Sequence, residues 1–322
     1  MTPTSDLDFS LPPGLVTGGP LPFRGKSRML VLDRTTGKCE HRRLADLPEY
    51  ARGLQVWVNN SKLYRGVVVL WRDTGHRAEA WLKRKRDDRT WEATLAAATG
   101  YIEDRRAWYL EADGSKVEIL EVLGPQRVLL GFEEPADLEM VGHLPVLSWV
   151  RRPKDPAEYP WYEPLYAREV GTLASPTAGV SLDPDTLGKL DLRELTLHID
   201  IDGLRRIETA YVEQHEPFSP AEPYRIADPP AGKVLAVGTT VVKALETWAR
   251  TGQAEGRSTL LVYEGFEFKA TAAFLTNFHF PREKMLAMTA AFGGTENVRR
   301  AYREAIAQRY RFADYGDSML IV

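Results

Sequence analysis

Residues 64–132 form a block of short β-rich runs with turn signals between them and no convincing helix. The runs are 67–71, 78–82, 90–95, 107–110, 116–122 and 127–132. Turn sequences such as Asp73-Thr74-Gly75 and Asp113-Gly114 separate them. Strands at hairpin spacing with no helix to cover a sheet face are typical of a small closed barrel or a sandwich. We therefore predict that residues 63–134 form an inserted small antiparallel β-barrel domain.

The sequence on both sides of this block shows the patterns of alternating strands and helices. Residues 233–237 form an apolar run that predicts a buried strand, and residues 241–250 carry apolar side chains at helical spacing. Residues 296–309 show a second helical stripe. Further strands are expected at 29–32, 54–58, 194–199 and 259–262. We predict an α/β main domain, a mixed sheet with helices, built discontinuously from residues 1–62 and 135–322.

The composition sets the broad class of the protein. A chain of 322 residues, 43% hydrophobic and 27% charged, can form about two domains. Its one cysteine, Cys39, excludes an internal disulfide framework and suits a reducing cytosol. The first ten residues carry Asp6 and Asp8 and lack the apolar core of a secretory signal. No apolar run reaches the ~20 residues that span a bilayer. We expect a cytoplasmic protein with no membrane partner.

Metal binding is not expected, because histidine and cysteine residues never fall at the spacing of metal ligands. The net charge of −3 provides no basic field for nucleic acid over the whole protein. Local basic runs do occur, at 24–28, at 83–89 and among the arginines of 299–311. Such runs are either solvated faces or a binding surface for a polyanion.

Residues 275–282 contain four polar side chains that could catalyse a reaction or bind a ligand, and they lie between two apolar runs, 270–275 and 285–292. The four are Thr276, Asn277, His279 and Arg282. Polar groups gathered at the end of a buried element are where sites tend to be built. The alternative is a polar loop in which the asparagine caps a turn and a backbone carbonyl holds the histidine.

Two further stretches could hold a ligand. Gly238-Thr239-Thr240 places backbone N–H groups and two hydroxyls at a helix N-terminus, which can accept a carboxylate or phosphate. The alternative there is an ordinary threonine cap. Residues 175–179 supply small residues and hydroxyls, but by composition they are a turn. General acid–base groups are available at His198, His215 and Glu246.

Ordered motifs run along nearly the whole chain. They include Leu11-Pro12-Pro13, Ser27-Arg28-Met29-Leu30, Val58-Asn59-Asn60, Pro176-Thr177-Ala178-Gly179, Thr196-Leu197-His198, Val237-Gly238-Thr239-Thr240, Leu275-Thr276-Asn277-Phe278-His279 and Ala301-Tyr302-Arg303-Glu304-Ala305-Ile306. In content and in order, this set resembles the S-adenosylmethionine:tRNA ribosyltransferase-isomerase family of queuosine biosynthesis. The resemblance implies a main α/β domain with an inserted β-barrel.

The resemblance also implies a reaction. The ribosyl group of S-adenosylmethionine, a co-substrate, is transferred and isomerised onto 7-aminomethyl-7-deazaguanine at the wobble position of tRNA. The products are epoxyqueuosine in tRNA, adenine and methionine. It implies no permanently bound cofactor and a tRNA partner with a GUN-type anticodon, and we expect a monomer.

Such chemistry needs a base to remove a proton beside the sulfonium, an acid to help adenine leave, and a groove for the anticodon. The acid–base groups at matching positions are His279, His198, His215 and Glu246. The predicted S-adenosylmethionine-binding residues are Thr177, Gly179, Gly238, Thr239, Thr240 and Asn277. The predicted RNA-binding residues are Arg24, Arg28, Arg282 and Arg303.

Two segments depart from the family pattern. Residues 180–183 replace Leu-His-Phe-Thr, and residues 199–204 replace a segment of the form Val-Gly-x-Gly-Thr-Phe. The alternative function is therefore a diverged paralogue that keeps the fold and binds a nucleoside or RNA without this activity.

Overall fold

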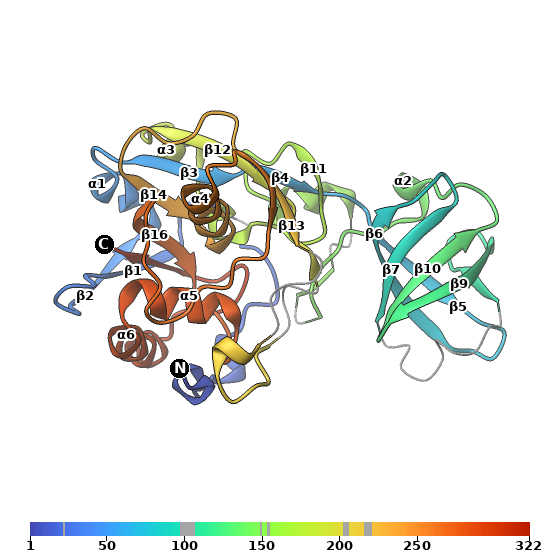
Figure 1. The fold of residues 1–322 in the computed structure, drawn as a ribbon, viewed down its shortest axis with the longest axis horizontal. Coiled ribbons are helices and arrows are strands. Elements are labelled where there is room, and N and C mark those ends of the chain that lie inside the picture. Colours follow the sequence, from blue (N-terminus) through green and yellow to red (C-terminus); the bar gives the residue numbers. More distant parts are fainter. Residues whose placement is uncertain (22, 97–106, 149, 153–154, 202–205, 216–220) are drawn as a thin grey trace. The chain divides into compact units, whose positions relative to one another are not determined.

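The computed structural model describes residues 1–21, 23–96, 107–148, 150–152, 155–201, 206–215 and 221–322. The chain divides into two compact units, one formed by Met1–Lys62 with Ser148–Val322 and the other by Leu63–Leu147. The first contains a large mixed sheet with helices and the second a closed barrel (Figure 1). The predicted fold class is confirmed. The barrel unit continues past residue 134 because α2 (Leu138–Val141) packs on the barrel core and His143 pairs with Val67.

In the described part of the smaller unit, six antiparallel strands close in the order β10-β7-β6-β5-β8-β9. Their bounds are β5 Val67–Trp71, β6 Arg77–Lys85, β7 Thr90–Ala96, β8 Trp108–Leu110, β9 Lys116–Gly124 and β10 Arg127–Phe132. Along β10 every second residue is buried, so one side of each strand fills the barrel. The guanidinium of Arg72 lies inside, 4.0 Å from the ring centroid of Trp108.

The larger unit is organised by a sheet in which nine described strands follow the order β15-β13-β12-β3-β14-β16-β17-β1-β2. Their bounds are β1 Arg28–Leu32, β2 Cys39–Arg43, β3 Gln55–Asn59, β12 Leu192–Leu197, β13 Glu222–Arg225, β14 Val234–Val237, β15 Glu255–Ser258, β16 Thr271–Asn277 and β17 Ser318–Ile321. The central strands β12, β3, β14 and β16 are mutually parallel. A short sheet pairs β4 (Ser61–Leu63) with β11 (Glu169–Thr172).

The strand predicted at 259–262 is wrong. The edge strand β15 ends at Ser258, and the following apolar residues are irregular. Their apolarity has another cause, because Val262 is buried and Leu260 and Leu261 pack against the main core as coil.

Helices cover both faces of the large sheet. On one face lie α4 (Thr239–Thr251), α5 (Lys284–Gly293) and α6 (Thr295–Ala307), which share a core with Trp57 and Phe274 (Figure 1). On the other face, Val58 and Val237 pack with Ala178 and Leu182. The short elements are α1 Leu47–Tyr50, α3 Pro184–Leu187, and 3₁₀ turns at Thr4–Leu7, Pro13–Leu15, Leu44–Asp46, Pro156–Tyr162, Thr177–Gly179 and Val212–Gln214. Within the described ranges, no helix has the length and apolarity to cross a membrane.

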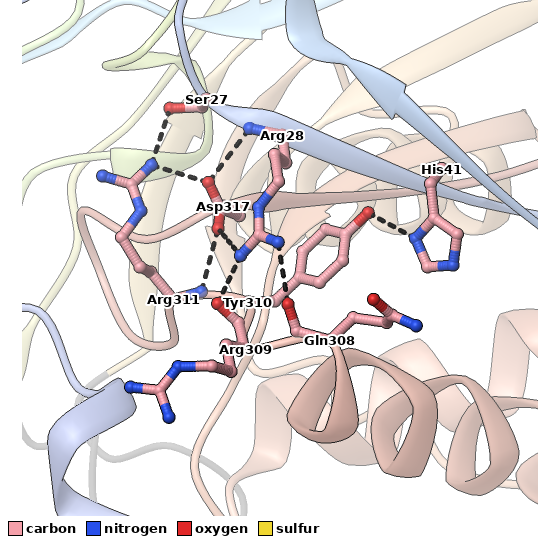
Figure 2. A network of polar contacts seen from close by, with 8 residues as sticks. All are labelled: Ser27, Arg28, His41, Gln308, Arg309, Tyr310, Arg311 and Asp317. Atoms are coloured by element: carbon pink, nitrogen blue, oxygen red, sulfur yellow. Dashed lines mark hydrogen bonds and ion pairs between the residues drawn. The ribbon is translucent and has the colours of Figure 1, made fainter.

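A buried carboxylate ties the last strand to the first (Figure 2). Asp317, 1% exposed, accepts hydrogen bonds from the backbone N–H and guanidinium of Arg311 and from the backbone N–H of Arg28. Burial alone would raise the pKa of Asp317, but these bonds outweigh burial and lower it. The Arg28 side chain also donates to the carbonyls of Gln308 and Arg309 and covers the Tyr310 ring at 4.1 Å.

We predict that Asp317→Ala lowers the free energy of unfolding by about 3–5 kcal/mol at pH 7, because it leaves two guanidinium groups without their buried partner. The lowered pKa means that this stabilisation is complete above the unfolded-state pKa, about 4, and is lost as the pH falls through the folded-state value. Urea unfolding of both proteins at pH 7 and at successively lower pH measures the difference. A difference that stays constant as the pH falls would contradict this account.

Candidate active site

Four parallel strands end at the same edge of the large sheet. The last residues of β3, β12, β14 and β16 are Asn59, Leu197, Val237 and Asn277. The register places Leu195 opposite Asn59, and Val237 opposite both Val58 and Leu275. Because the carboxyl ends of parallel strands are where ligands bind in open α/β sheets, this edge is the candidate site.

Asn59 holds this edge together and is fully buried. Its amide nitrogen donates to the Leu197 carbonyl at 2.9 Å and to the Thr240 hydroxyl at 3.2 Å. Its carbonyl oxygen accepts from the backbone N–H groups of Leu197 at 3.0 Å and Ser61 at 3.1 Å. One side chain thus joins the ends of β3 and β12 to the first turn of α4.

Helix α4 begins at this edge because Gly238 makes a turn with φ of +95°. A Cβ on Gly238 would lie 3.3 Å from the Cβ of Ala178, so the turn requires glycine for both conformation and space. No side chain caps the helix, which leaves backbone N–H groups at its start available to a ligand. Thr239 and Thr240, both half-buried, provide hydroxyls beside them.

The turn at Thr177–Gly179 lies against the same edge. The Thr177 hydroxyl is 3.4 Å from the Asn277 side-chain oxygen, to which it donates. Gly179 is closely packed, since a Cβ there would meet the Tyr166 hydroxyl at 1.7 Å. The structure therefore brings together all six residues predicted to bind S-adenosylmethionine: Thr177, Gly179, Gly238, Thr239, Thr240 and Asn277.

His198 lies immediately beyond the end of β12. Its ring packs on Gly171, where an added Cβ would come within 2.9 Å of it, so the facing position must be glycine. Burial lowers the pKa of His198, while the charge of Glu169 acts in the opposite direction. Its Nδ1 is buried and has no hydrogen-bond partner among the described residues. A neutral imidazole with an unused ring nitrogen is suited to accept a proton or to bind a ligand.

His279 lies beyond the end of β16 in a more enclosed position. Its Nε2 is 2.8 Å from the Thr276 hydroxyl, and its backbone N–H donates to the Tyr302 hydroxyl at 3.0 Å. Burial lowers its pKa to about 3, so the ring is neutral at physiological pH. Its Nδ1 lies 3.9 Å from an oxygen of Glu283. Burial, reinforced by the charge of Asp314, raises the pKa of Glu283 to about 8.

The two histidines are at different places along the edge. Strands β12 and β16 are separated by β3 and β14, so their ends lie three strand spacings apart, roughly 14 Å. The main-chain positions of His198 and His279 are therefore well separated along the edge. An elongated ligand along the edge would meet one at each end, with the start of α4 between them.

Glu246 is not at this edge. Its buried carboxylate accepts hydrogen bonds from the backbone N–H groups of Lys269, Ala270 and Thr271 and from Arg250. These N–H groups lie at the start of β16, roughly 20 Å along the strand from Asn277. The carboxylate therefore holds the first residues of β16 and those just before it in place. The fourth predicted acid–base residue, His215, follows the turn at Val212–Gln214, whose backbone bonds to Thr2 in the N-terminal segment.

The four predicted RNA-binding arginines separate into two classes. Arg24 donates to the carbonyls of Pro160, Glu163 and Val180, and Arg28 belongs to the Asp317 network, so both guanidinium groups hold the fold together. Arg282 and Arg303 are 47% and 62% exposed, and their ion pairs, with Asp8 and Glu296, lie at the surface. The second class is the better suited to a phosphate, because its guanidinium groups are more exposed and are not tied to backbone carbonyls.

The sequence did not single out three features of the site. Asn59 was part of a motif but carried no predicted role, Tyr302 was assigned only to the apolar stripe and motif of a helix, and Glu283 was not considered. A buried ion pair was also missed: Lys243 of α4 donates to Glu222 of β13 at 2.6 Å, and Glu222 accepts from the backbone N–H of Asp200. This pair links the chain after His198 to the second turn of α4.

Comparison with known proteins assigns the family. The sequence model described as "Queuosine biosynthesis protein" matches residues 4–321. The chain belongs to this family. It is 35% identical to a Nitrosospira multiformis protein and 34% identical to one from Aquifex aeolicus, both named S-adenosylmethionine:tRNA ribosyltransferase-isomerase. These matches cover 98% of the chain and 97% and 99% of the relatives.

A solved structure agrees with the family assignment. The S-adenosylmethionine tRNA ribosyltransferase of Thermotoga maritima matches 98% of this chain and 100% of its own, with 26% identity and a TM-score of 0.53. Of the two segments predicted to depart from the family pattern, 180–183 has a structural role here, because Asp183 accepts from the Thr186 N–H and caps α3. Residues 202–204 of the other segment lie outside the described residues.

We predict that Asn59→Ala lowers the free energy of unfolding by about 2–4 kcal/mol, because the buried N–H and carbonyl of Leu197 both lose a partner. It also weakens binding of S-adenosylmethionine, because the end of β12 and the start of α4 lose their connection. Chemical unfolding and calorimetry measure the two effects. The matched control is Asn297→Ala, whose side chain also bonds backbone carbonyls but away from this edge. Equal effects of the two substitutions on ligand affinity would contradict the assignment.

Proposed function

We propose that this protein transfers the ribosyl group of S-adenosylmethionine onto 7-aminomethyl-7-deazaguanine at the wobble position of tRNA and isomerises it. The products are epoxyqueuosine in tRNA, adenine and methionine. The tRNA carries a GUN-type anticodon, the protein acts as a cytoplasmic monomer, and S-adenosylmethionine is consumed as a co-substrate.

One observation carries the proposal most directly. Four sequence motifs far apart in the chain, ending at Gly179, His198, Thr240 and His279, meet at the carboxyl edge of the parallel strands. Relatives that match 98% of the chain with 34–35% identity are named for this activity. Full-length similarity at this level favours the enzyme over the alternative of a diverged paralogue without activity.

The start of α4 suits the carboxylate of the methionyl group. Its uncapped N–H groups and the hydroxyls of Thr239 and Thr240 are donors, and a helix N-terminus favours negative charge. Thr177 and Asn277 lie beside this position and would bind the ribose or the amino group. The sulfonium would then lie among neutral side chains, since burial keeps both histidines uncharged.

We assign the base to His198 and the acid to the His279–Glu283 pair. His198 has an unused ring nitrogen and stays neutral at pH 7, so it can take the proton beside the sulfonium. With a pKa of about 3, His279 is too weak a base for this step. Glu283 keeps its proton up to a pH of about 8. It can supply this proton by way of the neighbouring His279 ring as adenine leaves.

Arg282 and Arg303 are the arginines that we assign to RNA phosphates. Arg282 lies on the loop between β16 and α5, residues 278–283, which we call the His279 loop, and Arg303 lies on α6. Both side chains are exposed. Contacts to phosphate position an RNA without reading its sequence. The anticodon base would be read at the edge itself.

Release of adenine from S-adenosylmethionine tests the function. We expect the purified protein to release adenine only when tRNA carrying the 7-aminomethyl-7-deazaguanine base is present. His198→Asn should reduce kcat by about 100-fold or more, the usual contribution of a general base, with little change in S-adenosylmethionine affinity. His76→Asn, a histidine on a barrel turn, is the matched control and should retain activity. No adenine release by the unaltered protein would overturn the proposed function.

The pH dependence tests the acid separately. If protonated Glu283 is required, kcat falls as the pH rises through about 8, and it falls on the acid side as His198 becomes protonated below its ordinary pKa. Glu283→Gln can still accept the hydrogen bond from the Phe280 backbone N–H, but it can neither supply a proton nor titrate, so kcat should fall and the remaining activity should lose its alkaline decline. An unchanged alkaline limb in Glu283→Gln would exclude Glu283 as its origin.

A further inference from the structure

A pocket of about 420 Å³ lies between the N-terminal segment and the outer side of helices α5 and α6. Its wall is apolar over Leu7, Phe9, Leu286, Val298, Tyr302 and Ile306. The rings of Phe9 and Tyr302 meet edge to face at 5.4 Å. Small-molecule sites have volumes of about 300–1,000 Å³ and mostly apolar linings with a few polar groups. This pocket meets both criteria and is not part of the strand edge described above.

Charges of opposite sign line the pocket from two different elements. Asp6 and Asp8 belong to the N-terminal segment, and Arg299 and Arg303 belong to α6. Asp8 pairs with Arg282 at 3.1 Å, whereas Asp6 has no ion-pair partner in the described ranges. Both arginines also contact Glu296, yet they remain 44% and 62% exposed and keep further donors.

We propose that this pocket binds a free α-amino acid with a large apolar side chain. The apolar wall takes the side chain, Asp6 takes the ammonium group, and Arg299 takes the carboxylate. A nucleobase of RNA fits the apolar wall, but only an amino acid brings an ammonium group to Asp6. The identification of the amino acid as methionine, the reaction product with a large apolar side chain, rests on the proposed function. Binding of an apolar amino acid to the pocket does not depend on that function.

The pocket is connected to the strand edge by one residue. Tyr302 lines it with its ring, and its hydroxyl accepts the hydrogen bond from the backbone N–H of His279. An amino acid packed on this ring would bias the position of the His279 loop. The site therefore provides a route by which released methionine slows the enzyme without occupying the place of S-adenosylmethionine.

Calorimetry with L-methionine alone, without tRNA or S-adenosylmethionine, tests the binding site. We expect saturable binding that Asp6→Asn and Arg299→Gln each weaken about tenfold or more, since each removes a charged hydrogen-bonding group. Asp228→Asn, an exposed aspartate elsewhere on the same unit, is the matched control and should bind normally. L-Leucine should bind and L-aspartate should not. Absence of L-methionine binding, or binding that neither variant weakens, would overturn the proposal.

Competition distinguishes this site from that of S-adenosylmethionine. L-Methionine should bind with an unchanged Kd when S-adenosylmethionine is saturating, and Asp6→Asn should leave the affinity for S-adenosylmethionine unchanged. Competition between the two ligands would show that the pocket is the methionyl subsite of the co-substrate and would overturn the second site. Because neither measurement depends on adenine release, failure here is distinct from failure of the proposed function.

Discussion

The hydrogen bonds of Asn59 are the interactions on which the candidate site depends. A parallel sheet leaves its last N–H and carbonyl groups without ladder partners, and at a buried edge each of these must be satisfied. Asn59 satisfies both for Leu197 and also bonds the Thr240 hydroxyl. An aspartate could not donate these bonds, and an aliphatic residue could make none of them. The position of His198 relative to α4 therefore depends on this amide.

Around that amide, burial and glycine shape the chemistry of the edge. Gly171 and Gly238 let a histidine ring and a helix start approach where any side chain would interfere. Burial then removes charge from His198 and His279 and keeps a proton on Glu283. A cationic sulfonium would enter a site whose two histidines are neutral, with the dipole of α4 and the threonine hydroxyls available to its carboxylate. His198 and the His279–Glu283 pair lie at different places along the edge, which suits the two roles that we propose for them.

Local patterns in the sequence were sufficient to predict the barrel and helix α4, although not every strand of the main domain. The hairpin spacing of residues 67–132 and the helical stripe after Gly238 depend only on neighbours in the chain, and both predictions are confirmed. The roles of charged residues depended on distant partners instead. Glu246 and Arg28 have the side chains of an acid and a phosphate ligand, but backbone groups far along the chain occupy them. Glu283 is the opposite case, because only burial in the folded protein gives its carboxyl a pKa near 8.

We propose that S-adenosylmethionine binds along the carboxyl edge of β12, β3, β14 and β16. Amide hydrogen exchange with and without saturating S-adenosylmethionine tests it most directly. The account predicts slower exchange, on ligand addition, in peptides that contain 177–179 and 238–241, with no change in peptides from the barrel strands. Protection confined to α6 and the N-terminal segment, with none at the start of α4, would contradict it.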